Sequence, residues 1–465
     1  MSKSGFAKNK YVPHWVNFGL FVVTLILNLN IAYSPDDWKD LADSRDYLHQ
    51  AKISLLDKEF YFPHTAKNFD PRPFTVPLFY KICRGNTDVI VQMQKFMLSL
   101  SAFLMVAVMI MFFEGSGAKY ILMTGVYLLV SWWNVLGWSV LILSESLSTS
   151  LLFCWLASFL FLYKKGSWHR WWLHAVITLL FAFSRDSWPY VLLAFYAGIC
   201  LLWLLLKQPG VKKYLALLAM CVIIFFTQQA GAKMGERSKL PVINSIVLRV
   251  LPDTAYTNWF VRNGMPDAER LKRNFGVLPA FNEDSAYQLW TLYNDTAYRS
   301  FTNWAAEKGQ ATYTRFLITH PRYVFLTDES PAQLSRIMSY NLFYIDEPRG
   351  YSVYVQSLFP LFNIRVVAVL CIVLMIIYIR RKTPILYAPV FLLLFTSLNA
   401  LLCYNADALE VRRHLYLTTI LLQLTGFWAV SLIWDSLEWR RSRGVILPSF
   451  GRYNSNDQNL VPPTT

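Results

Sequence analysis

Charged residues are scarce in this chain of 465 residues, where they make up 16% of the total against 55% for hydrophobic types. Soluble domains usually carry about 25% charged residues, so this composition excludes a soluble globular protein. The hydrophobic residues gather into runs that could cross a hydrocarbon core of about 30 Å, which takes roughly 17 to 25 helical residues. We therefore expect an all-α polytopic membrane protein with about ten spans, at 14–33, 95–113, 119–137, 141–163, 171–185, 189–206, 213–231, 358–379, 384–403 and 414–434.

Cysteine is also scarce, with six residues in the chain. Five of them fall in or at the end of an expected span, which leaves Cys83 alone in an outer segment. This distribution excludes a disulfide framework and a cysteine-type zinc site. The sequence also lacks internal repeats, low-complexity tracts and the glycine-rich loops that cradle phosphate.

The net charge of +15 follows the expected topology. With the N-terminus in the cytosol, the short outer turns carry only Arg185, Arg412 and Arg413. The short cytosolic segments carry basic clusters at 3–10, 119, 164–170, 207–213, 380–382 and 440–452. This bias is the positive-inside rule, so we expect both termini in the cytosol, the chain in the cytoplasmic membrane, and no nucleic-acid partner.

Two outer segments are much longer than the turns between spans, and they divide the chain. We expect a membrane domain at 1–231 that includes an outer loop at 34–94, then an extracytoplasmic domain at 232–357. A second membrane domain at 358–435 and a cytosolic tail at 436–465 follow. Long loops in compact proteins usually carry function, so the outer segments are the place to look for chemistry.

The outer loop contains an amphipathic pattern between residues 38 and 56. Its apolar residues at helical spacing are Leu41, Tyr47, Leu48, Ala51 and Leu55. The pattern predicts a helix that lies at the membrane surface, followed by a second short helix from Val76 to Cys83. In the extracytoplasmic domain, 285–299 and 313–320 also have helical patterns, although the domain fold is not predicted.

One ordered set of residues stands out in the outer loop. Asp43-Ser44-Arg45-Asp46-Tyr47 precedes Ala51, then Arg72-Pro73-Phe74, and then Pro77-Leu78-Phe79-Tyr80. This order resembles the first outer loop of GT-C fold glycosyltransferases that use lipid-phosphate sugars, in which an Asp-Ser-x-x-Tyr-x-x-x-Ala helix precedes Arg-Pro and Pro-Leu-Tyr elements. The resemblance implies a GT-C-like fold with Asp43 as candidate general base, Asp46 as a second candidate, and Arg72 and Tyr47 at the substrate. The alternative is that both aspartates merely solvate an exposed helix face.

Glu145 is the only acidic residue in the apolar run LILSESLSTSLL. Counting back from Lys164 at about 1.5 Å per residue places it near the outer membrane face. A buried charge there is unfavourable unless it is paired or faces water, so Glu145 could hold the acceptor, a divalent metal or an arginine. The Ser-Glu-Ser sequence resembles an element of many GT-C enzymes. A helix N-cap by Ser144 and Glu145 is the alternative.

Two further elements lie in short outer turns. Arg185, next to Asp186, follows a short span and could be recessed as part of the substrate site, or it could form a plain turn ion pair. The late run from Glu410 to Tyr416 resembles the family's Arg-Tyr element near the donor phosphate. Arg412 and Arg413 would suit a phosphate diester because guanidinium gives paired, charge-assisted hydrogen bonds. Their alternative role is contact with lipid headgroups.

Together, these elements predict a membrane glycosyltransferase. It would move a sugar from a polyprenyl-phosphate donor to an envelope glycan or a lipid-linked acceptor, on the outer face of the membrane and among membrane lipids. One carboxylate could suffice, because the donor already has a phosphate leaving group, whereas glycosidases need a pair. A divalent cofactor (Mg²⁺, Mn²⁺ or Ca²⁺) stays open, because Asp43, Asp46 and Glu145 fall short of a full ligand shell. A lipid or glycan transporter or flippase, and an envelope polysaccharide polymerase or ligase, are the alternatives.

Overall fold

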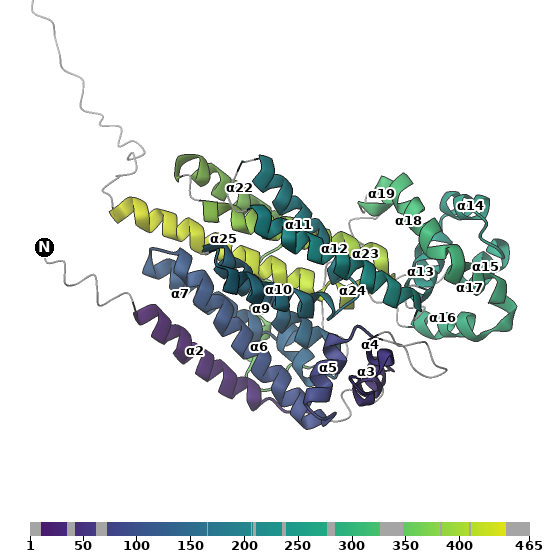
Figure 1. Cartoon of the computed structure of the whole chain (residues 1–465), viewed down its shortest axis with the longest axis horizontal. Coiled ribbons are helices and arrows are strands. Elements are labelled where there is room, and N and C mark those ends of the chain that lie inside the picture. Colours follow the sequence, from purple (N-terminus) through teal and green to yellow (C-terminus); the bar gives the residue numbers. More distant parts are fainter. Residues whose placement is uncertain are drawn as a thin grey trace, which may run out of the picture.

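The computed structural model describes residues 11–34, 42–61, 72–164, 166–205, 207, 211–234, 239–276, 284–325, 347–381, 384–408 and 411–442. Within these ranges the regular elements are helices, with no strand. Figure 1 shows an elongated bundle of helices with a group of shorter helices at one end. The all-α prediction is therefore confirmed.

Seven of the described helices are long and apolar enough to cross a membrane. They are α2 (Val12–Leu29), α6 (Thr87–Met109), α9 (Ser144–Lys164), α11 (Trp188–Leu205), α12 (Val211–Met234), α23 (Ala388–Ala406) and α25 (Tyr416–Ser442). An eighth candidate span is bent by 61° and joins α7 (Ser116–Ser131) to α8 (Trp133–Leu136) and η3 (Gly137–Val140). The remaining expected positions hold α10 (Trp168–Ala182) and α22 (Ile364–Arg381), whose apolar part is limited to Ile364–Ile379. The chain is thus a polytopic membrane protein.

The surface of the bundle is apolar where it would meet lipid. Val369, Ile372 and Ile376 on α22 are each more than half exposed, at 59%, 60% and 52%. Trp15 and Val23 on α2 are exposed in the same way. Isoleucine, valine and tryptophan at helical spacing on a surface are unfavourable in water and favourable in hydrocarbon. By contrast, α9 and α25 are mostly buried and form the centre of the bundle.

The outer loop forms α3 (Ala42–Lys52), α4 (Lys58–Tyr61) and α5 (Thr75–Ile82). Both expected helices are therefore present, although Leu41 lies outside the described residues. Tyr47 and Ala51 are buried in the core of the membrane bundle, and the Tyr47 ring lies edge-on to Tyr80 at 6.0 Å. Leu55, which was expected on the apolar face, is exposed instead, because α3 ends at Lys52. The loop is thus packed onto the end of the bundle that was expected to lie outside, which is called the outer end below.

The segment between α12 and α22, which was expected to lie outside the membrane and is here named the outer domain, folds around a second hydrophobic core. Its helices are α13 (Lys239–Ser245), η4 (Ile246–Val250), α14 (Thr254–Arg262), α15 (Ala268–Phe275), α16 (Asp284–Asn294), η5 (Thr296–Tyr298), α17 (Arg299–Trp304), η6 (Ala305–Gly309), α18 (Gln310–Thr319) and α19 (Pro321–Val324). The helical pattern at 313–320 is confirmed by α18, whereas the pattern at 285–299 is divided between α16 and η5. Figure 1 shows this group at the end of the bundle that also carries α3 to α5. The chain then returns to the membrane through α21 (Ser352–Gln356).

Candidate active site at the outer end of the bundle

Helix α3 presents its two aspartates on one face, because residues three apart are neighbours on an α-helix. The Arg72 guanidinium lies against this face. Its Nη2 is 2.5 Å from Asp43 Oδ1 and 3.0 Å from Asp46 Oδ2. Asp46 is only 8% exposed, so the alternative of two aspartates solvating an open helix face is wrong. The two halves of the motif in the outer loop meet through this arginine.

Gln50, one turn further along α3, positions the Arg72 backbone. The Gln50 side chain accepts a hydrogen bond from Arg72 N at 2.9 Å and donates to Arg72 O at 2.9 Å. It also donates to Phe60 O at 2.9 Å, and it is fully buried. A buried amide that is fully satisfied by backbone groups fixes the segment it binds. Sequence reasoning missed Gln50, although a polar residue between Tyr47 and Ala51 on the apolar face was a signal.

Glu145 lies in the first turn of α9 and is fully buried. Its Oε1 is 2.6 Å from Arg413 Nε and 3.5 Å from Arg185 Nη2. Of the roles considered for Glu145, the structure therefore shows arginine binding. The position in the first turn also suits the helix dipole, which was part of the alternative interpretation of Glu145. Tyr416 adds a hydrogen bond from its hydroxyl to the Glu145 carbonyl oxygen at 2.5 Å.

Arg413 joins the outer loop to the membrane helices. While its Nε contacts Glu145, its Nη1 lies 2.8 Å from Asp43 Oδ2. Arg413 is itself only 5% exposed, so the alternative that it contacts lipid headgroups is wrong. Asp43, Asp46, Glu145, Arg72, Arg185 and Arg413 thus form one connected group, here named the outer ionic cluster. It contains three carboxylates and three guanidiniums and is balanced in charge.

The electrostatics of this cluster keep Asp43 ionised. Burial alone would raise the pKa of Asp43, but the neighbouring Arg72 and Arg413 outweigh it and hold that pKa well below its usual range. Burial alone would lower the pKa of Arg72, but the charge of Asp43 outweighs it and raises that pKa above its ordinary value. In this state Asp43 is a strong ion-pair partner and a weak acceptor for a proton.

His414 connects the cluster to the outer domain. Arg185 Nη2 donates to His414 Nδ1 at 2.9 Å, and His414 Nε2 faces Asp407 Oδ2 at 4.0 Å. Asp407 in turn accepts a hydrogen bond from Asn244 of α13 at 3.0 Å. Burial, together with the nearby positive charge of Arg185, lowers the pKa of His414 to about 3, so the ring is neutral. His414 is therefore hydrogen-bonded to the cluster through Arg185, and it lies beside Asp407 without a hydrogen bond to it.

The remaining predicted residues are placed as follows. Tyr47 lies under Arg72, whose guanidinium carbon is 5.6 Å from the ring centroid. Arg185 belongs to the cluster rather than to a simple turn, and the neighbouring Asp186 accepts a hydrogen bond from Gln228. The backbone of Arg412 belongs to α24 (Val411–His414), but its side chain lies outside what the structure describes.

Metal binding was left open, and the described residues form no group of three or more histidine, cysteine, aspartate or glutamate side chains that could hold an ion. The three carboxylates of the outer ionic cluster contact guanidiniums instead. Their oxygens would have to exchange arginine for metal before they could form an oxygen shell. Within the described residues, these carboxylates are therefore partners of arginine.

The chain matches no protein-family model and no curated protein. What the outer ionic cluster can do must therefore be argued from its chemistry. It combines buried guanidiniums, which suit phosphate, with a carboxylate that is a quarter exposed, at one end of helices that would lie in lipid. Such a site suits a ligand with an apolar tail and an anionic head.

Proposed function

We propose that this protein is a GT-C-type glycosyltransferase with ten spans that uses a polyprenyl-phosphate sugar on the outer face of the cytoplasmic membrane. The observation that carries the proposal is Arg413, which bridges Asp43 and Glu145. The three residues come from three separate elements of the sequence that resemble the family. Their meeting at one end of the bundle supports a shared task.

The guanidiniums would hold the phosphate of the donor. Arg413, in α24, and Arg185, between α10 and α11, both lie beside Glu145. A phosphate diester that enters here competes with the carboxylates for the same donors, and charge-assisted bonds from a planar guanidinium suit its oxygens. The isoprenoid tail would then lie against the apolar helices. This arrangement explains why a transferase for such a donor is built in the bilayer.

Asp43 would act as the general base. With both arginines in place its pKa is too low for a base, so the proposal requires that the donor phosphate draw Arg413 away. Loss of that neighbour raises the pKa of Asp43 toward its ordinary value. Asp43 then accepts the proton of the acceptor hydroxyl while that oxygen attacks the anomeric carbon. The bond between this carbon and the phosphate oxygen breaks, and polyprenyl phosphate leaves with inversion.

The test is transfer by purified protein that carries Asp43→Asn. Release of polyprenyl phosphate is the readout, because it is common to every sugar and acceptor. We expect a loss of about 10²- to 10⁴-fold, which is the contribution of a general base. Asp46→Asn is the matched control, because it removes the other Arg72 partner but should leave measurable transfer.

Both variants must first be shown to be folded at the assay temperature, well below their melting temperatures. Wild-type rates for Asp43→Asn, with loss of activity in Asp46→Asn or Glu145→Gln, would show that the base has been misassigned. Full activity in all three variants would contradict the mechanism. No release by the wild type from any polyprenyl-phosphate sugar would favour a transporter or flippase.

A further inference from the structure

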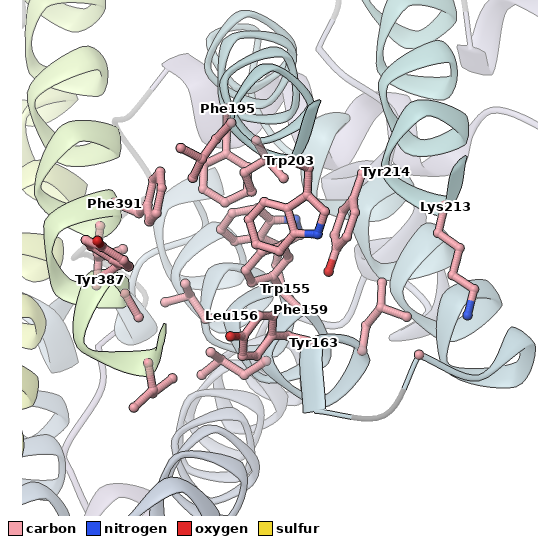
Figure 2. A pocket seen from close by; sticks show the side chains of 18 of the residues that line it. Trp155, Leu156, Phe159, Tyr163, Phe195, Trp203, Lys213, Tyr214, Tyr387 and Phe391 are labelled. Atoms are coloured by element: carbon pink, nitrogen blue, oxygen red, sulfur yellow. The ribbon is translucent and has the colours of Figure 1, made fainter. Parts of the chain in front are cut away.

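A second site lies at the other end of α9. Twenty residues from α9, α11, α12, α22, α23 and α25 and their flanking segments line a cavity of about 440 Å³. Half of these residues are aromatic, and Figure 2 shows Trp155, Trp203 and Tyr214 close together, with Lys213 beyond Tyr214. A cavity of this size with apolar walls and few polar groups is typical of a small-molecule site.

This cavity is separate from the outer ionic cluster. Trp155 and Tyr163 follow Glu145 by 10 and 18 residues on one helix. At 1.5 Å per residue they lie about 15 and 27 Å from it along the axis. The cavity therefore belongs to the half of the bundle near Lys164, which the positive-inside rule places at the cytosolic leaflet.

The walls of the cavity are held by a buried network of hydrogen bonds. Trp155 Nε1 donates to the Tyr196 hydroxyl at 3.2 Å, and His174 contacts that hydroxyl through Nε2 at 2.5 Å. His174 Nδ1 is 2.7 Å from Ser158 Oγ. These groups are fully buried or nearly so, so they fix the Trp155 ring in place before a ligand arrives.

Two polar groups of the lining point to an acidic lipid. Trp428 is 3% exposed, and its indole N–H has no hydrogen-bond partner among the described residues. A buried donor of this kind is unfavourable until an acceptor oxygen reaches it. Lys213 is partly exposed at the edge of the lining, and its Nζ lies beside Gly166. Its ammonium would meet the headgroup region of the cytosolic leaflet.

We propose that this cavity binds one anionic phospholipid of the cytosolic leaflet. One acyl chain lies among Trp155, Phe159 and Trp203, and the phosphate pairs with Lys213. The ester oxygens supply the acceptor that Trp428 lacks. The positive charge of Lys213 at the rim favours an anionic lipid over a zwitterionic one, because a zwitterionic headgroup would place its own cation near the Lys213 ammonium. This site is independent of the proposed transfer reaction.

The experiment is native mass spectrometry of the full-length protein after titration with phosphatidylglycerol or phosphatidylcholine. We expect the wild type to bind one phosphatidylglycerol in preference to phosphatidylcholine. Lys213→Glu should reduce that preference by at least about fivefold, the factor that corresponds to about 1 kcal/mol for one basic residue at an anionic surface. Lys212→Glu is the matched control, because Lys212 is exposed and does not line the cavity.

A second variant, Ala388→Trp, fills the cavity from α23 and should abolish tight binding of both lipids. If the Ala388→Trp protein fails to fold, Lys213→Glu still tests the site, because the side chain of residue 213 lies at the rim and its replacement should not disturb folding. Equal effects of Lys213→Glu and Lys212→Glu would overturn the site. The site would also be overturned if a folded Ala388→Trp protein bound both lipids as the wild type does. Displacement of the phospholipid by polyprenyl phosphate would show that the cavity serves the donor tail instead.

Discussion

At the scale of single residues, the contacts that Asp43 makes determine how much it contributes to stability. A carboxylate on an exposed helix face, the alternative considered from the sequence, would contribute little to folding. In the structure the Asp43 side chain is only 25% exposed and contacts two guanidiniums. Its removal would leave Arg72 and Arg413 with one partner fewer. Asp43→Asn is therefore expected to lower stability as well as activity.

The pH dependence of stability follows from the lowered pKa of Asp43. A group whose pKa is lower in the folded state stabilises that state above its unfolded pKa, which for Asp is about 3.8. This contribution is lost as pH falls through 3.8 toward the folded value. We therefore expect the wild type to melt above Asp43→Asn by the same margin at pH 7 and pH 5, with the margin shrinking below about pH 4. Melting curves over this range would measure it, and a margin that already narrows between pH 7 and pH 5 would mean that the Asp43 pKa is raised.

The candidate residues of the site could be predicted from the sequence, but the contacts between them could not. Asp43, Glu145 and Arg413 were each candidates because acidic and basic residues are rare near apolar runs. The contact between Arg413 and Glu145 joins positions 268 apart in the chain. No local pattern encodes a partner at that distance. Gln50, His414 and Asp407 were missed for the same reason, since their roles depend on what lies opposite them.

At the scale of elements, helix positions were predictable because hydrophobic runs set them. A helix covers each of the ten expected spans, and α3 and α5 lie where the outer loop was expected to be helical. The bend of 61° after α7 was not foreseen. Nor was the packing of α3 onto the bundle, because an amphipathic pattern shows that one face is buried but not against what. The fold of the outer domain depends on long-range packing in the same way.

At the scale of the whole molecule, two different sites lie toward opposite ends of the bundle. The outer ionic cluster lies where α3, α5 and the outer domain meet the membrane helices, and the aromatic cavity lies near Lys164 and Lys213. This polarity depends on the orientation that was inferred from lysine and arginine. It can be tested directly.

Single cysteines at exposed positions test the orientation. Ser300→Cys in the outer domain should react with an impermeant thiol reagent added from outside, whereas Ser167→Cys should not. The six native cysteines are buried or partly buried and give a low background. Labelling of intact cells, with permeabilised cells as the control, would measure this. Reaction of Ser167→Cys alone would reverse every assignment of side.

The central claim is that the outer ionic cluster binds the phosphate of a polyprenyl lipid, and equilibrium binding of polyprenyl phosphate tests it most directly. This ligand is common to every sugar, so the sugar need not be known. We predict saturable binding by the wild type, weaker binding by Arg413→Lys, which lacks the planar fork, and the weakest by Arg413→Ala. Arg315→Ala, an exposed arginine of the outer domain, should bind like the wild type. Absence of saturable binding, or equal affinity in folded wild-type and Arg413→Ala proteins, would contradict the account.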